Sequence, residues 1–200
     1  MSTSTRRRRS LRHTLAAILA AGGLAACSDP FEIKPNLETV ETTFTLHAIN
    51  GSPPTAPTAA VLINTPGATR IGSSFAFDLA FDVTDAGKAL LYPVDLVASD
   101  VALPPNRYVG YQVVTDRGYD ALVEAPNKGY TYGQPLELQV GTVGFLQSNA
   151  HPLCTGSFTP YIYAKFRVDA VDVAARTVKL TVRSDPNCGF RGLQPGLPTR

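Results

Sequence analysis

The stretch FAFDLAFDV, residues 75–83, alternates large apolar side chains with alanine or aspartate. In an extended strand, successive side chains point to opposite faces, so the apolar residues would share one face, and Asp78 and Asp82 the other. A sheet with one buried face and one hydrated face produces this alternation. We therefore expect a half-buried β-strand here, with both aspartates on the solvated face.

Alternation of this kind recurs along the chain, whereas helical periodicity is hard to find beyond Cys27. About nine strands are expected, at 43–49, 59–64, 75–83, 89–97, 108–115, 119–124, 136–145, 161–171 and 177–183. Pro93 cannot donate to a ladder, so its strand is expected at a sheet edge or a bulge. Many short strands without crossover helices favour an all-β fold. We expect an antiparallel immunoglobulin-like β-sandwich over residues 43–190, followed by a C-terminal tail at 191–200.

Three turns are predicted to join neighbouring strands as hairpins. Segments 84–88 and 115–119 each place Asp ahead of Gly between strand-like runs. Asp can hydrogen-bond its own turn backbone, and Gly takes the left-handed position of a turn with a bulge. A third hairpin is expected at 172–176, where it would pair the apolar face of 162–168 with that of 178–182.

The first 27 residues have the layout of an export signal. A basic stretch ends near Arg12, and the apolar stretch that follows is too short to span a bilayer as a helix. Leu24-Ala25-Ala26-Cys27 then resembles the lipobox of bacterial lipoproteins. The resemblance implies that residues 1–26 are a signal peptide and that Cys27 becomes a lipidated N-terminus. Segment 27–42 would then be an extended tether.

Three other readings of this segment stay open. The arginine run at 6–9 is also compatible with a nuclear or nucleic-acid-binding patch, or with a twin-arginine export signal. Cys27 is also compatible with a buried or disulfide-bonded thiol.

The residues after Cys27 bear on which membrane holds the anchor. By resemblance to Gram-negative sorting, Ser28 after the cysteine favours the outer membrane, although Asp29 weakens that inference.

The charge balance argues against a nucleic-acid partner. The chain has 18 Lys and Arg against 16 Asp and Glu. Without the five arginines of residues 1–26, 13 bases remain against 16 acids, a balance of −3. A mildly acidic body with scattered bases lacks the clustered positive surface that phosphate binding needs. We therefore expect no nucleic-acid partner. The expected partners are the membrane, through the lipid anchor, and an envelope protein or glycan of unknown identity.

Two cysteines remain beyond the lipobox, Cys154 and Cys188. An even pair in an exported chain favours a disulfide over two free thiols or a redox pair. Such a bond would flank the last predicted hairpin.

Catalytic and metal-binding patterns are weak. His47 falls on an expected strand and His151 in a loop, and no GxSxG nucleophile elbow accompanies them. A bridged Cys154 could not act as a nucleophile beside His151. Asp78, Asp82 and Asp85 could supply oxygen ligands to calcium, but a solvated strand face is the simpler reading. We expect no catalytic residue, no metal site and no cofactor.

Tyrosines supply the most distinctive candidate surface. Tyr108, Tyr111, Tyr130 and Tyr132 lie close together in the sequence, and Tyr161 and Tyr163 share one strand face. An exposed cluster of tyrosines suits protein or sugar recognition, whereas the same residues also serve as ordinary strand formers.

These features together predict a lipid-anchored cell-envelope protein, whose sandwich is a non-catalytic binding or structural module. Two alternatives are a small envelope hydrolase using His151 and a tyrosine-lined ligand-binding module.

Overall fold

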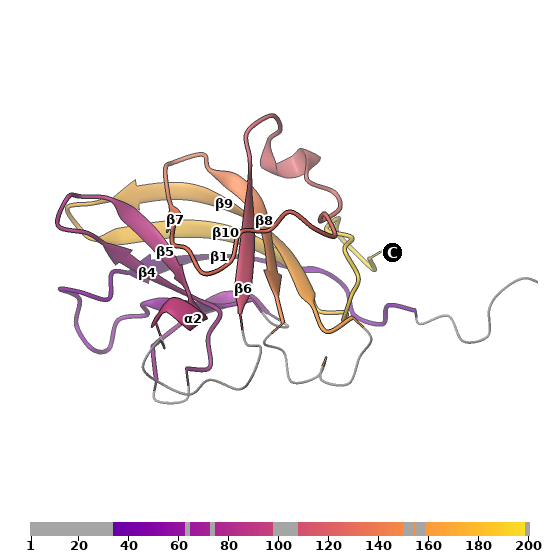
Figure 1. The fold of residues 1–200 in the computed structure, drawn as a ribbon, viewed down its shortest axis with the longest axis horizontal. Coiled ribbons are helices and arrows are strands. Elements are labelled where there is room, and N and C mark those ends of the chain that lie inside the picture. The colour runs from indigo at the N-terminus through magenta and orange to yellow at the C-terminus, as the bar shows by residue number, and fades with distance from the viewer. Residues whose placement is uncertain are drawn as a thin grey trace, which may run out of the picture. The chain divides into compact units, whose positions relative to one another are not determined.

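The computed structural model describes residues 34–62, 65–72, 75–97, 108–149, 154 and 159–198. Contacts divide the chain into Met1–Lys34 and Pro35–Arg200. The second unit contains two antiparallel sheets of five strands each (Figure 1). This arrangement confirms the predicted all-β, antiparallel, immunoglobulin-like sandwich in its layer architecture, with ten strands among the described residues where about nine were expected.

The first sheet, called sheet A, has the strand order β1-β10-β9-β8-β6. Its strands are β1 (Val40–His47), β6 (Val109–Val114), β8 (Val143–Ser148), β9 (Ile162–Asp172) and β10 (Thr177–Asp185). The second, sheet B, has the order β3-β2-β4-β5-β7. Its strands are β2 (Ala59–Val61), β3 (Gly67–Thr69), β4 (Leu79–Val83), β5 (Ala89–Pro93) and β7 (Leu136–Glu137). The short helix α2 (Val94–Val97) follows β5, and the 3₁₀ turn η1 (Tyr119–Ala121) follows β6.

The main core lies between the two sheets. On β9 and β10, alternate residues point inward as the sequence predicts, and they are buried against residues such as Phe81 and Leu91 of sheet B. The inward residues of the two strands are Ala164, Phe166, Val168, Val178, Leu180 and Val182. Burying each large apolar side chain contributes about 1.5–3 kcal/mol, so this layer is the main source of stability.

Two of the three predicted hairpins are present, and the third is wrong. Segment 84–88 joins β4 to β5, and segment 172–176 joins β9 to β10, both antiparallel. Segment 115–119 makes no hairpin, because β6 pairs with β8 and the expected strand at 119–124 is replaced by η1. Tyr119 and Leu122 are both buried, so burial of these side chains fixes the path of the segment.

The expected strand at 136–145 is divided between the two sheets. Leu136–Glu137 pairs with β5 in sheet B, and Val143–Ser148 pairs with β6 and β9 in sheet A. Gly141, with φ 86°, lies in the turn between them. Pro93 is the last residue of β5 and lies beyond Leu90 and Leu91, the residues that pair with β7.

The expectation that Asp78 and Asp82 face solvent is wrong, because both are buried. The Asp78 carboxylate accepts hydrogen bonds from the Leu62 amide at 2.7 Å and the Ser148 hydroxyl at 2.6 Å. Asp82 accepts from the Asn50 backbone amide at 3.2 Å and from Arg176 at 3.2 Å. Each carboxylate therefore joins segments that are distant in the sequence.

The ends of the second unit are joined to each other. The Asn187 side chain accepts hydrogen bonds from the backbone amides of Asn36 and Leu37 at 3.0 and 3.1 Å, and it donates to the Leu37 carbonyl at 2.8 Å. The Thr39 amide donates to the Gly196 carbonyl at 2.9 Å. The folded body therefore begins near residue 36, within the segment expected to be tether, and includes most of the expected C-terminal tail.

The two remaining cysteines are bonded, as the sequence predicts. Cys154 is fully buried and forms a disulfide with Cys188, with a Cα–Cα distance of 5.6 Å. Cys27 and His151 lie outside the described residues.

Candidate functional site

The outer face of sheet A, which points away from the main core, carries a second apolar cluster. It is made by Tyr119, Leu122, Ala125, Val143, Phe145, Tyr163 and Leu193. The segment after β6 and the C-terminal segment cover it and pair with each other. The Ala125 amide donates to the Arg191 carbonyl at 2.8 Å, and the Leu193 amide donates to the Val123 carbonyl at 2.8 Å. The two paired segments therefore form a raised, fixed layer on the outer face of sheet A.

Five tyrosine rings gather beside that cover, and we call them the tyrosine cluster: Tyr108, Tyr130, Tyr132, Tyr161 and Tyr163. The Tyr108 and Tyr132 rings meet edge to face with centroids 5.2 Å apart. Tyr130 lies 6.5 Å from Tyr132 and 6.3 Å from Tyr163, and Tyr161 lies 6.3 Å from Tyr163. Rings at these separations attract one another beyond the effect of burial alone.

The hydroxyl groups of the tyrosine cluster are held by neighbouring polar groups. The Tyr132 hydroxyl donates to Oε1 of Gln147, and the Gln147 amide donates to the Tyr163 hydroxyl at 2.9 Å. The Tyr130 hydroxyl donates to the Pro126 carbonyl at 2.9 Å. Burial, reinforced by the nearby Tyr161 hydroxyl, raises the pKa of Tyr132 to about 12. At neutral pH the Tyr132 phenol is therefore uncharged, and the surface combines apolar rings with fixed polar tips.

Most of the cluster can still reach solvent. Tyr132 is 39% exposed, and Tyr108, Tyr130 and Tyr161 are half-buried, while Tyr163 is buried at the base. Tyr108, Tyr132 and Tyr161 line a shallow depression of about 550 Å³ together with Gly133 and Asp95 of α2. Figure 1 places α2 near the start of β6, where Tyr108 lies. Among the described residues, Oδ1 of Asp95 is buried without a hydrogen-bond partner.

Tyr111 is not part of the cluster, although the sequence groups it with Tyr108, Tyr130 and Tyr132. It packs against the main core, and its hydroxyl donates to the Pro135 carbonyl at 3.1 Å. At the neighbouring position, Gly110, a side chain would face outward, and its Cβ atom would overlap the Tyr132 ring. The strand alternation that separates Tyr111 from this face also provides the glycine on which Tyr132 lies.

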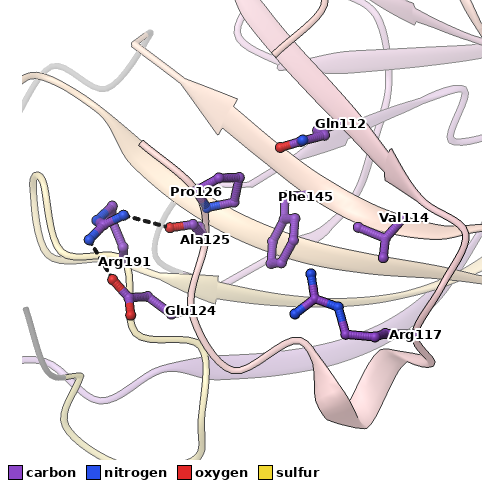
Figure 2. A pocket seen from close by; sticks show the side chains of 8 residues that line it. All are labelled: Gln112, Val114, Arg117, Glu124, Ala125, Pro126, Phe145 and Arg191. Carbon is purple, nitrogen blue, oxygen red and sulfur yellow. Dashed lines mark hydrogen bonds and ion pairs between the residues drawn. The ribbon is translucent and has the colours of Figure 1, made fainter. Parts of the chain in front are cut away.

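A second hollow on the same face is lined by charged and apolar groups (Figure 2). It has a volume of about 290 Å³ and is lined by Gln112, Val114, Arg117, Glu124, Ala125, Pro126, Phe145 and Arg191. Gln112 and Phe145 are direct cross-strand partners on β6 and β8. We call this hollow the arginine pocket. Neither of its arginines was identified from the sequence, because they come from two separate loops.

The two arginines of this pocket differ in their partners. Arg191 donates to the Ala125 carbonyl at 3.0 Å and forms an ion pair with Glu124. Among the residues that the structure describes, Arg117 pairs only with its neighbour Asp116, at 3.6 Å, and both side chains are more than half exposed. An exposed pair of this kind contributes little. Figure 2 shows the Arg117 side chain extending from its loop toward Phe145.

A buried lysine, Lys165, lies beneath η1. Lys165 is 4% exposed, and its amine donates to the Tyr119 carbonyl at 3.2 Å, with the Tyr119 ring centroid 4.4 Å away. Burial, reinforced by the charge of Arg183, lowers the pKa of Lys165. Glu41 balances this group by accepting from the Tyr119 hydroxyl at 2.8 Å and pairing with Arg183 at 3.0 Å. The arrangement fixes η1 to the sheet and leaves the amine covered.

The structure describes some of the other candidate residues that the sequence suggested. His47 is half-buried on β1, opposite Thr177, in keeping with an ordinary strand residue. Within the described part of the chain, no group of three or more His, Cys, Asp or Glu is arranged to hold a metal ion. Among the same residues, no helix has the length and apolar character needed to cross a bilayer.

Comparison of the chain with protein-family models, curated proteins and solved structures gave no match. The arrangement of residues on the outer face of sheet A is therefore the basis for any functional assignment.

Proposed function

We propose that the chain is a lipid-anchored cell-envelope protein, whose sandwich is a non-catalytic module that binds another envelope component through the tyrosine cluster. The observation that carries the binding role is the set of partly exposed rings on a strand-based surface, beside a depression of about 550 Å³. Amphipathic rings with few rotatable bonds suit protein and sugar recognition, since little side-chain entropy is lost when they are covered.

The anchor is inferred from the resemblance of Leu24-Ala25-Ala26-Cys27 to a lipobox. Two or more acyl chains on Cys27 would hold the chain stably at a membrane. Among the described residues, the hydrogen bond to the folded body that lies nearest Cys27 in the sequence is made at Asn36. Nine residues at ~3.3–3.6 Å each span roughly 30 Å, which would keep the sandwich close to the lipid surface.

The chemistry of the tyrosine cluster favours contact rather than catalysis. The Tyr132 and Tyr163 hydroxyls bind Gln147, and the Tyr130 hydroxyl binds the Pro126 carbonyl. Burial raises the pKa of Tyr132 to about 12, so this phenol is a poor acid or base at neutral pH. The ring faces and edges remain available to a partner.

The anchor is tested by mass spectrometry of the N-terminal peptide of the mature protein. We expect a fatty-acylated Cys27, and the acyl groups should be absent from a Cys27→Ser chain. A mature N-terminus without any acyl group would remove the membrane location, and with it the proposed role.

The binding surface is tested by chemical crosslinking in cells. The wild-type chain should give a discrete crosslinked species that is lost in the double variant Tyr108→Ala/Tyr161→Ala. Tyr92→Ala is the matched control, because Tyr92 is half-buried on β5 of the other sheet. An unchanged crosslinked species in the double variant would show that contact occurs elsewhere.

A further inference from the structure

The arginine pocket presents one cation that has no strong partner. The charge of Arg191 is compensated by Glu124, and its position is fixed by the Ala125 carbonyl. Within the described part of the chain, Arg117 has only the weak contact with Asp116, and its side chain is 55% exposed. A guanidinium group is planar and carries paired donors that match the two oxygens of a carboxylate. The pocket therefore has one free binding group for an anion.

An unused acceptor lies beneath the surface of the same pocket. Oε1 of Gln112 is buried and has no hydrogen-bond partner among the described residues. A buried polar atom in this state is unfavourable until a donor reaches it. The adjacent ring of Phe145 and the side chain of Val114 are apolar, so a ligand that satisfies the amide would also contact an apolar surface.

We propose that the arginine pocket binds the C-terminal residue of a peptide. The terminal carboxylate pairs with Arg117, and an apolar side chain packs on the half-buried Val114 beside the edge of Phe145. The Gln112 side chain turns toward the ligand, so that its Oε1, which is buried in the unliganded pocket, accepts from the amide N–H of the same residue. A terminal peptide residue carries these three groups on one Cα atom. The volume of about 290 Å³ lies at the lower end of ligand pockets, which fits one residue rather than a longer segment.

The charge of the lining favours a carboxylate over a phosphate. The lining contains two arginines and one acid, Glu124, and a second acid, Asp116, lies 3.6 Å from Arg117 beside it, so the pocket has little net positive charge. A dianionic phosphate would lie near Glu124 with only one free guanidinium to balance it. A carboxylate needs only that one guanidinium.

The test is calorimetric titration of the full chain in detergent with N-acetyl-Ala-Leu, its C-terminal amide, acetate and inorganic phosphate. We expect saturable binding of the free acid, and at least tenfold weaker binding of the amide and of acetate. Arg117→Gln should weaken binding of the acid by about tenfold or more, since it removes a hydrogen bond to a charged group. Arg117→Lys should restore part of the loss, because it keeps the charge without the planar fork.

Arg70→Gln is the matched control, because Arg70 is an exposed arginine that follows β3 in the other sheet. It should leave binding of the acid unchanged. Equal binding of acid and amide, tighter binding of phosphate or acetate, or an equal loss in Arg70→Gln would each overturn the proposal, as would no binding by the folded chain. The tyrosine cluster and lipid anchor are tested by other variants, so failure here leaves the proposed function intact.

Discussion

Asp185 is a buried carboxylate whose ionisation destabilises the folded chain. It is fully buried at the end of β10, and Oδ1 accepts hydrogen bonds from the backbone and side-chain amides of Asn187 at 2.9 and 2.8 Å. Oδ2 has no partner among the described residues. Burial raises the pKa of Asp185 to about 6, and the two hydrogen bonds from Asn187 only partly oppose this effect.

The substitution Asp185→Asn should therefore stabilise the protein above pH 6. The amide oxygen can still accept from Asn187, and the neutral side chain removes the cost of burying a charge. The pKa of this carboxyl rises from 3.8 to about 6 on folding. At ~1.4 kcal/mol for each pH unit of displacement, ionisation costs the folded state on the order of 3 kcal/mol.

The pH dependence has a defined sign. Because the folded-state pKa is the higher one, the contribution of Asp185 to stability is fully present below about pH 4 and is lost as the pH rises through about 6. Urea unfolding of wild type and Asp185→Asn at pH 4, 6 and 8 should give curves that coincide at pH 4. They should separate by about 1–3 kcal/mol at pH 8, with the variant more stable.

Asp169→Asn supplies a control of opposite sign. Burial opposes the ionisation of Asp169, but hydrogen bonds from Thr181 and Arg167 outweigh it and lower the pKa. The ionised form is therefore stabilising, and Asp169→Asn should lower the free energy of unfolding at pH 7. The reasoning about Asp185 is refuted if Asp185→Asn is no more stable than wild type at pH 8, or if the difference does not shrink toward pH 4.

Three further predictions concern other contacts. Reduction, or the pair Cys154→Ser and Cys188→Ser, should cost up to ~3–4 kcal/mol in urea unfolding, and alkylation should modify both thiols only after reduction. Gly144→Ala should destabilise by ~1–3 kcal/mol in thermal unfolding, since its Cβ would lie 2.8 Å from the Phe166 ring and would overlap the backbone of β6. Arg176→Ala should lower the unfolding free energy by ~1–3 kcal/mol, because Arg176 donates to the Val83 carbonyl at 2.7 Å; Arg176→Lys should recover only part of this loss.

The sequence predicts the long strands because their side chains follow a simple rule. Along β9 and β10, the inward positions that line the main core are apolar, so this face is buried. The antiparallel pairing follows from the turn at 172–176, whereas the register shift at Lys179/Leu180 was not predicted. The same rule fails at 75–83. Asp78 and Asp82 alternate with apolar residues as a solvated face would, yet both are buried by partners far away in the sequence. Alternation gives the direction of a side chain, but it does not tell whether water lies there.

The incorrect hairpin at 115–119 has a related cause. Asp116 and Gly118 provide sound turn chemistry, and the chain does turn there. The partner of β6, however, is β8, and Tyr119 and Leu122 are buried on the outer face of sheet A instead of forming an added strand. Turn chemistry is local, whereas pairing depends on where apolar side chains can be buried.

The candidate surfaces show the same division between local and distant information. Tyr108, Tyr130 and Tyr132 are grouped in the sequence, and Tyr161 and Tyr163 share a face by alternation, so most of the tyrosine cluster was predictable. The two groups of tyrosines meet because β6, β8 and β9 are neighbours in sheet A. No local sequence pattern predicts that strand order. Gly110 carries no side chain, yet it makes room for the Tyr132 ring.

The arginine pocket was harder to predict, because Arg117 and Arg191 come from two loops that meet only when the C-terminal segment pairs with the segment after η1. A binding surface assembled in this way depends on the strand order, so variants that loosen the pairing of β6 with β8 should weaken both surfaces together.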